Sequence, residues 1–192
     1  TVICSYIWSA NLNLVNWCFP NIEGCSSISR AGRYYPVKFF FKPLMFVYAI
    51  FLSIFWKKMY DLLRNENIPI SKLYLLIALC SVLFLALYII FLGEGNYYRF
   101  FRQIGIFIFI FFTVLSQILY SIKLKKLSCF NYKLKNKQSF YAICIGVIGL
   151  FLLPFVIFEI VEIKNFKNIV SWNYFFLMQI YFLIIFFGLR KN

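Results

Sequence analysis

The sequence is divided into apolar runs of about 20 residues, separated by short charged segments. A run of this length, coiled as an α-helix, crosses the roughly 30 Å hydrocarbon core of a bilayer. Transmembrane β-barrels instead use segments of about ten residues in which apolar and polar positions alternate. Runs such as residues 104–115 are apolar on every side. The sequence therefore predicts an all-α fold, a polytopic transmembrane helical bundle.

Five such runs are clear, and the first ten residues are apolar enough to be the tail of an earlier helix. We therefore expect five to six spans. Residues 1–37 are predicted to be this helix remnant followed by an outer loop, and residues 38–192 to form a single five-span bundle. The five predicted spans cover residues 39–56, 73–92, 101–122, 140–158 and 170–189.

Composition supports the same class and narrows the expected partners. Hydrophobic residues make up 63% of the chain, well above the roughly half that is usual for soluble domains, so lipid must cover much of its surface. The formal charge is +14, which in a soluble domain would suggest nucleic acid. Here the basic residues lie almost wholly between the apolar runs, where they contact anionic headgroups. We expect membrane lipids as partners and no nucleic acid.

Basic residues also predict the orientation of the chain, because Lys and Arg are retained on the cytoplasmic side or its equivalent. They are concentrated in two connections, residues 57–72 and 123–137, and are fewer in the connections that alternate with these. This pattern places the carboxyl terminus inside and the loop before residue 37 outside. Four basic residues on that loop and the start of the next span, Arg30, Arg33, Lys38 and Lys42, run against the pattern.

Few residues offer catalytic chemistry. The chain has no histidine and only six carboxylates, so the usual general base and the usual nucleophile pairs are missing. Glu159 and Glu162 lie three residues apart at the end of a predicted span and so share a helix face. They would either act in acid–base chemistry or cation binding, or be solvated and paired with Lys164 or Lys167. No cofactor is predicted, and whether the protein is an enzyme stays open.

The six cysteines do not predict a metal site, because no pair has the C-x-x-C spacing and two lie inside apolar runs. Cys18 and Cys25 lie together on the predicted outer loop. They would either form a disulfide in an oxidising compartment or remain as two free thiols. Within the spans, polar residues such as Gln103, Gln117 and Gln179 are expected to hydrogen-bond across helices.

One loop carries a recognisable pattern. It reads Ser27-Ile28-Ser29-Arg30-Ala31-Gly32-Arg33-Tyr34-Tyr35-Pro36 and is followed by a Phe-rich span. This order resembles the outer loop of the Frag1/DRAM/Sfk1 family of six-span membrane proteins, where it lies between the first two helices. The start of the last predicted span, Asn168-Ile169-Val170-Ser171-Trp172-Asn173, is similar to the start of that family's last helix.

The resemblance implies a membrane protein that handles lipids or regulates a membrane process, such as a lipid or glycolipid-anchor remodelling factor or a scaffold. It also implies an outer site for a lipid headgroup, with the two loop arginines contacting phosphate. The residues implied in this site are Ser27, Ser29, Arg30, Gly32, Arg33, Pro36, Trp172 and Asn173. In the alternative, Gly32 and Pro36 shape a turn and Trp172 belongs to an aromatic belt at the membrane surface.

Two other function classes remain open. A non-catalytic accessory subunit of a larger respiratory or ATP-synthase-type complex would suit the lack of catalytic groups, with other membrane subunits as partners. A small transporter or channel would need a polar pathway through the bundle. No charged residue lies near the middle of a predicted span, which speaks against an ion-coupled transporter.

Overall fold

The computed structural model of the chain describes residues 1–127, 132–158 and 165–189, and all the regular secondary structure in these residues is helical. This confirms the all-α class. Three short helices come first, followed by five long ones. Their bounds are α1 Val2–Asn11, α2 Pro20–Glu23, α3 Ile28–Ala31, α4 Val37–Asn65, α5 Lys72–Ile90, α6 Asn96–Leu124, α7 Tyr132–Phe158 and α8 Phe166–Leu189.

Four helices of the described chain, α4, α5, α6 and α8, are long and apolar enough to cross a membrane. The protein is therefore an integral membrane protein with several transmembrane helices. Helix α7 has 27 residues, but only part of its side chains are described. The expected number of five to six spans stays a prediction.

The helix ends agree with the ends predicted from the sequence where a local capping residue is present. α5 begins directly after Ser71, whose hydroxyl accepts a hydrogen bond from the Leu73 amide at 3.3 Å. α4, by contrast, continues nine residues past the predicted end at residue 56 and reaches Asn65. Lysine is a good helix former, so Lys57 and Lys58 mark the membrane boundary without ending the helix.

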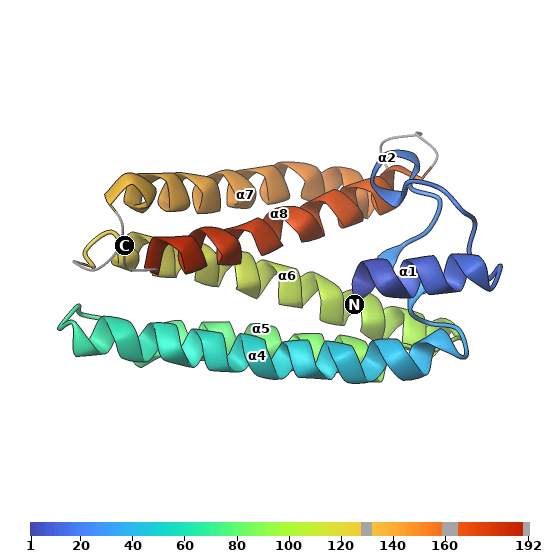
Figure 1. Cartoon of the computed structure of the whole chain (residues 1–192), viewed down its shortest axis with the longest axis horizontal. Coiled ribbons are helices and arrows are strands. Elements are labelled where there is room, and N and C mark those ends of the chain that lie inside the picture. Colours follow the sequence, from blue (N-terminus) through green and yellow to red (C-terminus); the bar gives the residue numbers. More distant parts are fainter. Residues whose placement is uncertain (128–131, 159–164, 190–192) are drawn as a thin grey trace.

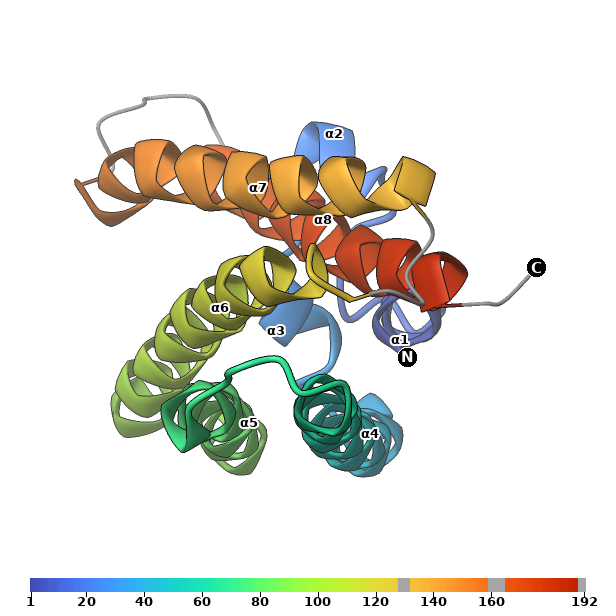
Figure 2. The same cartoon turned by 90° about the vertical axis from the view of Figure 1, so that its left-hand side faces the viewer.

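The long helices form a bundle, and the short ones lie at one of its ends (Figure 1). We call residues 1–36 the amino-terminal cap and this end of the bundle the cap end. α4 and α5 lie side by side and α5 packs closely on α6, while α7 and α8 form the other side of the bundle. In the end-on view of Figure 2, α6 and α7 run in clearly different directions, so these helices cross rather than lie parallel.

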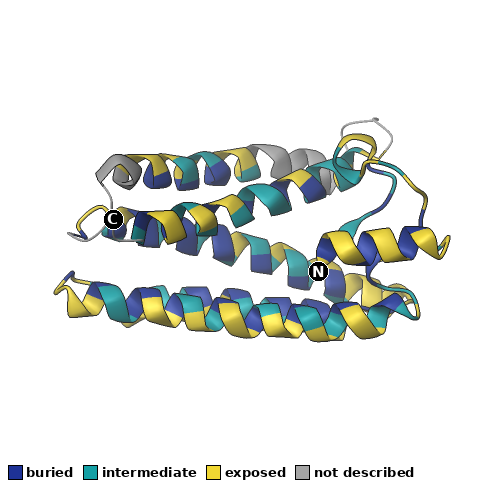
Figure 3. Ribbon diagram, in the orientation of Figure 1, coloured by how far each residue is buried: buried dark blue, intermediate teal, exposed yellow. Residues whose placement is uncertain are grey.

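Burial follows the helix faces (Figure 3). Aromatic side chains fill the interior, among them Trp56, Tyr120 and Tyr181. Large apolar side chains also cover the outward faces of the spans. Examples are Phe51, Leu83, Phe111 and Phe186, all exposed. Such a surface is stable only where hydrocarbon covers it.

Polar side chains link α6 to α7 and α8 inside the bundle. The Gln117 amide donates to the Met178 carbonyl oxygen at 3.1 Å, and the Gln138 amide donates to the Ser121 carbonyl oxygen at 3.1 Å. Ser121 also donates to the Tyr181 hydroxyl at 3.0 Å. On the other side of α8, Gln179 bonds with Tyr48. The expectation for Gln117 and Gln179 is thus confirmed, whereas it was wrong for Gln103, which is exposed.

Candidate functional site

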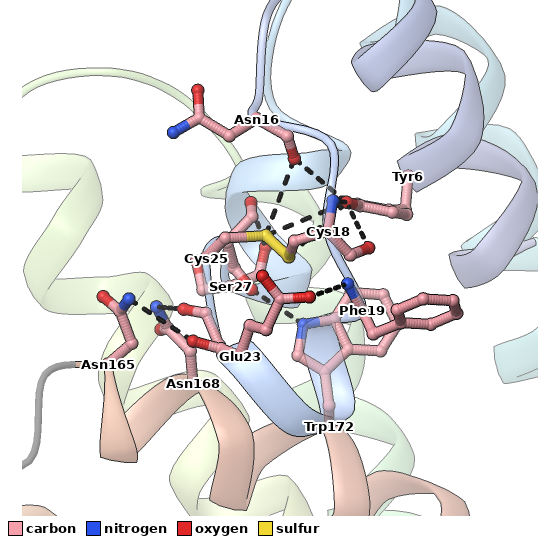
Figure 4. The surroundings of a disulfide bond; sticks show 12 residues. Tyr6, Asn16, Cys18, Phe19, Glu23, Cys25, Ser27, Asn165, Asn168 and Trp172 are labelled. Atoms are coloured by element: carbon pink, nitrogen blue, oxygen red, sulfur yellow. Dashed lines mark hydrogen bonds between the residues drawn. A yellow bond between two sulfur atoms is a disulfide. The ribbon is translucent and has the colours of Figure 1, made fainter.

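The amino-terminal cap is fastened to the first turns of α8 by side chains that donate to backbone carbonyls. The Trp172 indole donates to the Ser26 carbonyl oxygen at 2.8 Å, and the Asn168 amide donates to that of Gly24 at 2.7 Å (Figure 4). The Asn173 amide donates to the Asn21 carbonyl oxygen at 2.8 Å. The loop and the last helix, predicted to lie together, do lie together.

A disulfide closes the cap loop. Cys18 and Cys25 are bonded, with their Cα atoms 6.4 Å apart. The Tyr6 hydroxyl lies beside the bridge, where it accepts from the Cys18 amide at 2.9 Å and donates to the Asn16 carbonyl oxygen at 3.0 Å (Figure 4). The Tyr6 ring meets that of Trp172 edge-on, 5.9 Å between centroids. The bridge, α1 and α8 therefore form one packed unit.

Gly24 allows the close approach between cap and α8. Its φ of +62° lies in the left-handed region, which favours glycine. A Cβ at this position would lie 2.6 Å from the Asn165 carbonyl oxygen and 2.7 Å from Cγ1 of Ile169. Any side chain here would push the cap away from the helix.

The other loop residues predicted for a headgroup site lie in the last part of the cap, just before α4. Ser27 caps α3 by accepting from the Arg30 amide at 3.2 Å, and its hydroxyl lies 3.3 Å from that of Ser29. A Cβ on Gly32 would lie 2.5 Å from the Phe41 ring, so this glycine permits the chain to cross α4. Pro36, after a cis peptide bond, directly precedes α4.

Trp172 and Asn173 have structural partners in this arrangement. Trp172 is only 1% exposed, and its single N–H group is used by Ser26. The Asn173 amide contacts two carbonyl oxygens, those of Asn21 and Ile169. A role for either side chain in headgroup binding stays a prediction, and the structure gives each of them another function, holding the cap.

Two loop arginines, Arg30 and Arg33, bring positive charge to the cap end. Arg33 donates to the Tyr34 hydroxyl at 3.1 Å, while its Nε is buried without a hydrogen-bond acceptor. Partial burial of Tyr34 acts to raise the pKa of its phenol. The hydrogen bond from Arg33 and the charges of Arg33 and Arg30 outweigh this effect, so the pKa lies below its usual value of 10.0. The local potential is therefore positive.

Arg102, near the start of α6, joins this group, and it is not among the site residues predicted from the sequence. It is only 7% exposed and donates to the Gly93 carbonyl oxygen at 2.8 Å. The positive charges of Arg102 and Arg33 repel one another. One signal could have found it: Arg102 is in phase with Gly105 and Phe109, which form the buried face of α6.

We call Arg30, Arg33, Tyr34 and Arg102 the arginine cluster. Within the described part of the chain, no carboxylate pairs with Arg33 or Arg102. Two like charges, one of them almost buried, are costly to keep together without a counter-charge. Guanidinium groups with free N–H donors bind carboxylate and phosphate oxygens. The arrangement therefore has the chemistry of an anion site at the membrane surface.

The pair Glu159 and Glu162 was the other candidate for chemistry or cation binding. Glu159, Glu162 and Lys164 lie outside the described residues. Lys167, the other basic residue considered for that pair, is exposed on the first turn of α8.

Comparison of the chain with protein-family models, with curated proteins and with solved structures finds no match.

Proposed function

We propose that the protein is a lipid-handling membrane protein that binds the phosphate of a lipid headgroup in the arginine cluster at its outer end. The observation that carries the proposal is the almost buried Arg102, whose charge acts against that of Arg33, with no carboxylate partner for either residue in the described chain. A bound phosphate would supply the missing counter-charge and the missing acceptor for Nε of Arg33.

The position of the cluster supports a lipid rather than a soluble anion. Arg102 lies on α6, five residues above Phe107 in a continuous apolar helix, so a bound phosphate would lie close to the start of the hydrocarbon. Lys42 of α4 adds positive charge nearby, with its amine 3.1 Å from the Ile90 carbonyl oxygen at the end of α5. Basic pockets between transmembrane helices are typical sites for anionic headgroups.

The proposal includes a topology. We infer that α7 is a fifth span, since residues 140–158 form an apolar run long enough to cross a bilayer. The cap end is then outside and the carboxyl terminus is inside, because the most basic connections lie at the opposite end. With this arrangement the protein would resemble a Frag1/DRAM/Sfk1 protein, and a role in lipid or glycolipid-anchor remodelling, or as a scaffold, follows as the working hypothesis.

Native mass spectrometry of the protein purified in mild detergent, with identification of co-purifying lipid, tests the headgroup site. We expect the wild-type protein to retain a phospholipid or phosphorylated glycolipid. Arg33→Gln and Arg102→Gln should each lower retention by about ten-fold or more, the loss expected for a charge-assisted hydrogen bond. Arg102→Lys, which keeps the charge and a donor, should retain more lipid than Arg102→Gln and guards against a simple folding defect.

Arg64→Gln is the matched control, because Arg64 is an exposed arginine at the opposite end of the bundle. Its lipid retention should equal that of the wild type. Equal lipid retention in Arg33→Gln, Arg102→Gln and Arg64→Gln would contradict the proposal. Purification of stoichiometric unrelated subunits, with no phosphate-bearing lipid, would favour the accessory-subunit hypothesis instead.

A further inference from the structure

A groove of about 360 Å³ opens between α6, α7 and α8, on a face of α6 different from that of Arg102. Its α6 wall consists of residues 107, 110, 111, 114, 115 and 118, whose spacing of three and four residues defines one helix face. α7 contributes Gly146, Gly149 and their neighbours, and α8 contributes Val170, Ser171 and Tyr174. α6 and α7 cross here rather than run parallel (Figure 2).

The groove offers a ligand almost no polar group. Among the described residues that line it, only Ser171 and Tyr174 carry side-chain hydroxyls, and both are already used inside the protein. The Ser171 hydroxyl donates to the Lys167 carbonyl oxygen at 2.7 Å, and the Tyr174 hydroxyl donates to that of Ile145 at 3.0 Å. An occupant is therefore bound by apolar contact alone, which fits a hydrocarbon chain.

The dimensions of the groove fit one leaflet. From Phe107 to Ile118, at about 1.5 Å per residue, the α6 wall is about 16 Å long, close to half of the roughly 30 Å hydrocarbon core. Gly146 packs against Ile118, where a Cβ would lie 2.7 Å from Cδ1 of that side chain, so the helices are close together at the deeper end. The other end is level with the start of α8, toward the cap end.

Polar and basic residues precede the groove along α6, toward the cap end. Gln103 lies four residues before Phe107, and Arg99 lies four residues before Gln103; both are exposed. These positions are where the headgroup of a lipid would lie if its chain filled the groove, and Arg99 carries the charge that a phosphate requires.

We propose that this groove binds an acyl chain of an anionic phospholipid from the outer leaflet, with Arg99 contacting the headgroup. This second lipid site rests on the proposed lipid-handling function in one respect only: both sites are proposed to bind an anionic lipid. It shares no residue with the arginine cluster, so the two can be tested separately.

The test uses the full chain in nanodiscs of phosphatidylcholine that contain a small fraction of phosphatidylglycerol with a diazirine on one acyl chain. After irradiation, mass spectrometry of peptides locates the labelled residues. We expect labelling to concentrate on residues 107–118 and 143–150. Arg99→Gln should remove the preference of this labelling for phosphatidylglycerol over a diazirine-bearing phosphatidylcholine.

Val147→Trp fills the groove from α7, where the valine is 60% exposed. It should lower groove labelling by about ten-fold, the effect of losing two buried methylene groups. Val147→Phe, a smaller change, should give an intermediate reduction and excludes misfolding as the cause. The control is Leu83→Trp on α5, where the leucine is 62% exposed to lipid outside the groove. It should leave groove labelling unchanged.

Equal labelling of the groove and of the exposed face of α5, or undiminished labelling in Val147→Trp, would overturn the proposal. The proposal would also be overturned if the groove were covered by a second copy of the chain, which cross-linking between two copies at the groove residues would reveal. Arg33→Gln and Arg102→Gln should leave groove labelling intact. If they affect neither lipid retention nor labelling while Val147→Trp lowers labelling, the headgroup proposal fails and the groove stands.

Discussion

At the scale of single residues, Trp172 combines two contacts that substitution can separate. Its ring packs against Tyr6, while its N–H group bonds to the carbonyl oxygen of Ser26, a residue only 1% exposed. A buried carbonyl that loses its donor stays without a partner, and in a dry environment this costs more than the hydrogen bond itself contributed.

We predict that Trp172→Phe, which keeps an aromatic ring and removes the donor, lowers the free energy of unfolding by about 1–3 kcal/mol. Thermal unfolding in detergent, followed by the loss of monodisperse protein, measures the change. Trp17→Phe is the control, because Trp17 is 59% exposed and should be neutral. An unchanged stability of Trp172→Phe would mean that the indole hydrogen bond does not hold the cap.

The partners of Trp172 and Arg102 could not be predicted from the sequence. Trp172 was expected at the headgroup level from a resemblance, but its partner is a backbone carbonyl, and no side-chain pattern marks a carbonyl as an acceptor. Arg102 stands near other charges at the start of a span, although its phase with Gly105 places it on the buried face of α6. Its proximity to Arg33 depends on how the loop folds over the end of the bundle, which local spacing does not determine.

At the scale of elements, hydropathy locates the middle of each span better than its ends. α5, Lys72–Ile90, lies close to the predicted range because a serine cap begins it and a Gly-Glu-Gly segment follows it. α4 and α6 both extend past their predicted ranges. Helical hydrogen bonding is obligatory in lipid but is also possible beyond it, so the bilayer limits the apolar run and not the helix. The short helices of the cap escaped prediction because tertiary contacts hold them.

The contact between α2 and α8 depends on Gly24, which directly follows α2. Gly24→Ala should loosen the cap, because the new Cβ meets the backbone and a side chain of α8 and the φ is positive. We expect faster hydrogen exchange in residues 16–31 and a lower thermal stability.

Gly95→Ala is a matched control for Gly24→Ala. Gly95 also has a positive φ, +100°, but its nearest atom would be Cδ2 of Tyr98 at 3.9 Å, an ordinary contact. Gly95→Ala should therefore introduce backbone strain alone and leave hydrogen exchange in the cap unchanged. If both variants affect the cap equally, steric docking at Gly24 is not what holds it.

At the scale of the whole molecule, the arrangement makes the orientation testable. Glu94 follows the carboxyl end of α5 and Lys58 lies in the last turns of the antiparallel α4, so these two exposed residues lie toward opposite ends of the bundle. With the cysteines other than Cys18 and Cys25 replaced by alanine, Glu94→Cys should react with a membrane-impermeant maleimide in intact cells. Lys58→Cys should react only after permeabilisation. The reverse pattern would invert the topology, and it would place the arginine cluster on the cytoplasmic side.

The hydrogen bonds between the cap and α8 join residues that are 144 to 152 positions apart, as in the pair Trp172 and Ser26. At synthesis rates of about 5–20 residues per second, Ser26 leaves the ribosome roughly 7 to 30 s before its partner exists. The bridge between Cys18 and Cys25, only seven positions apart, needs no such delay. The cap is thus synthesised before the long helices but can dock only after the start of α8 has been made, so its docking depends on the last of these helices.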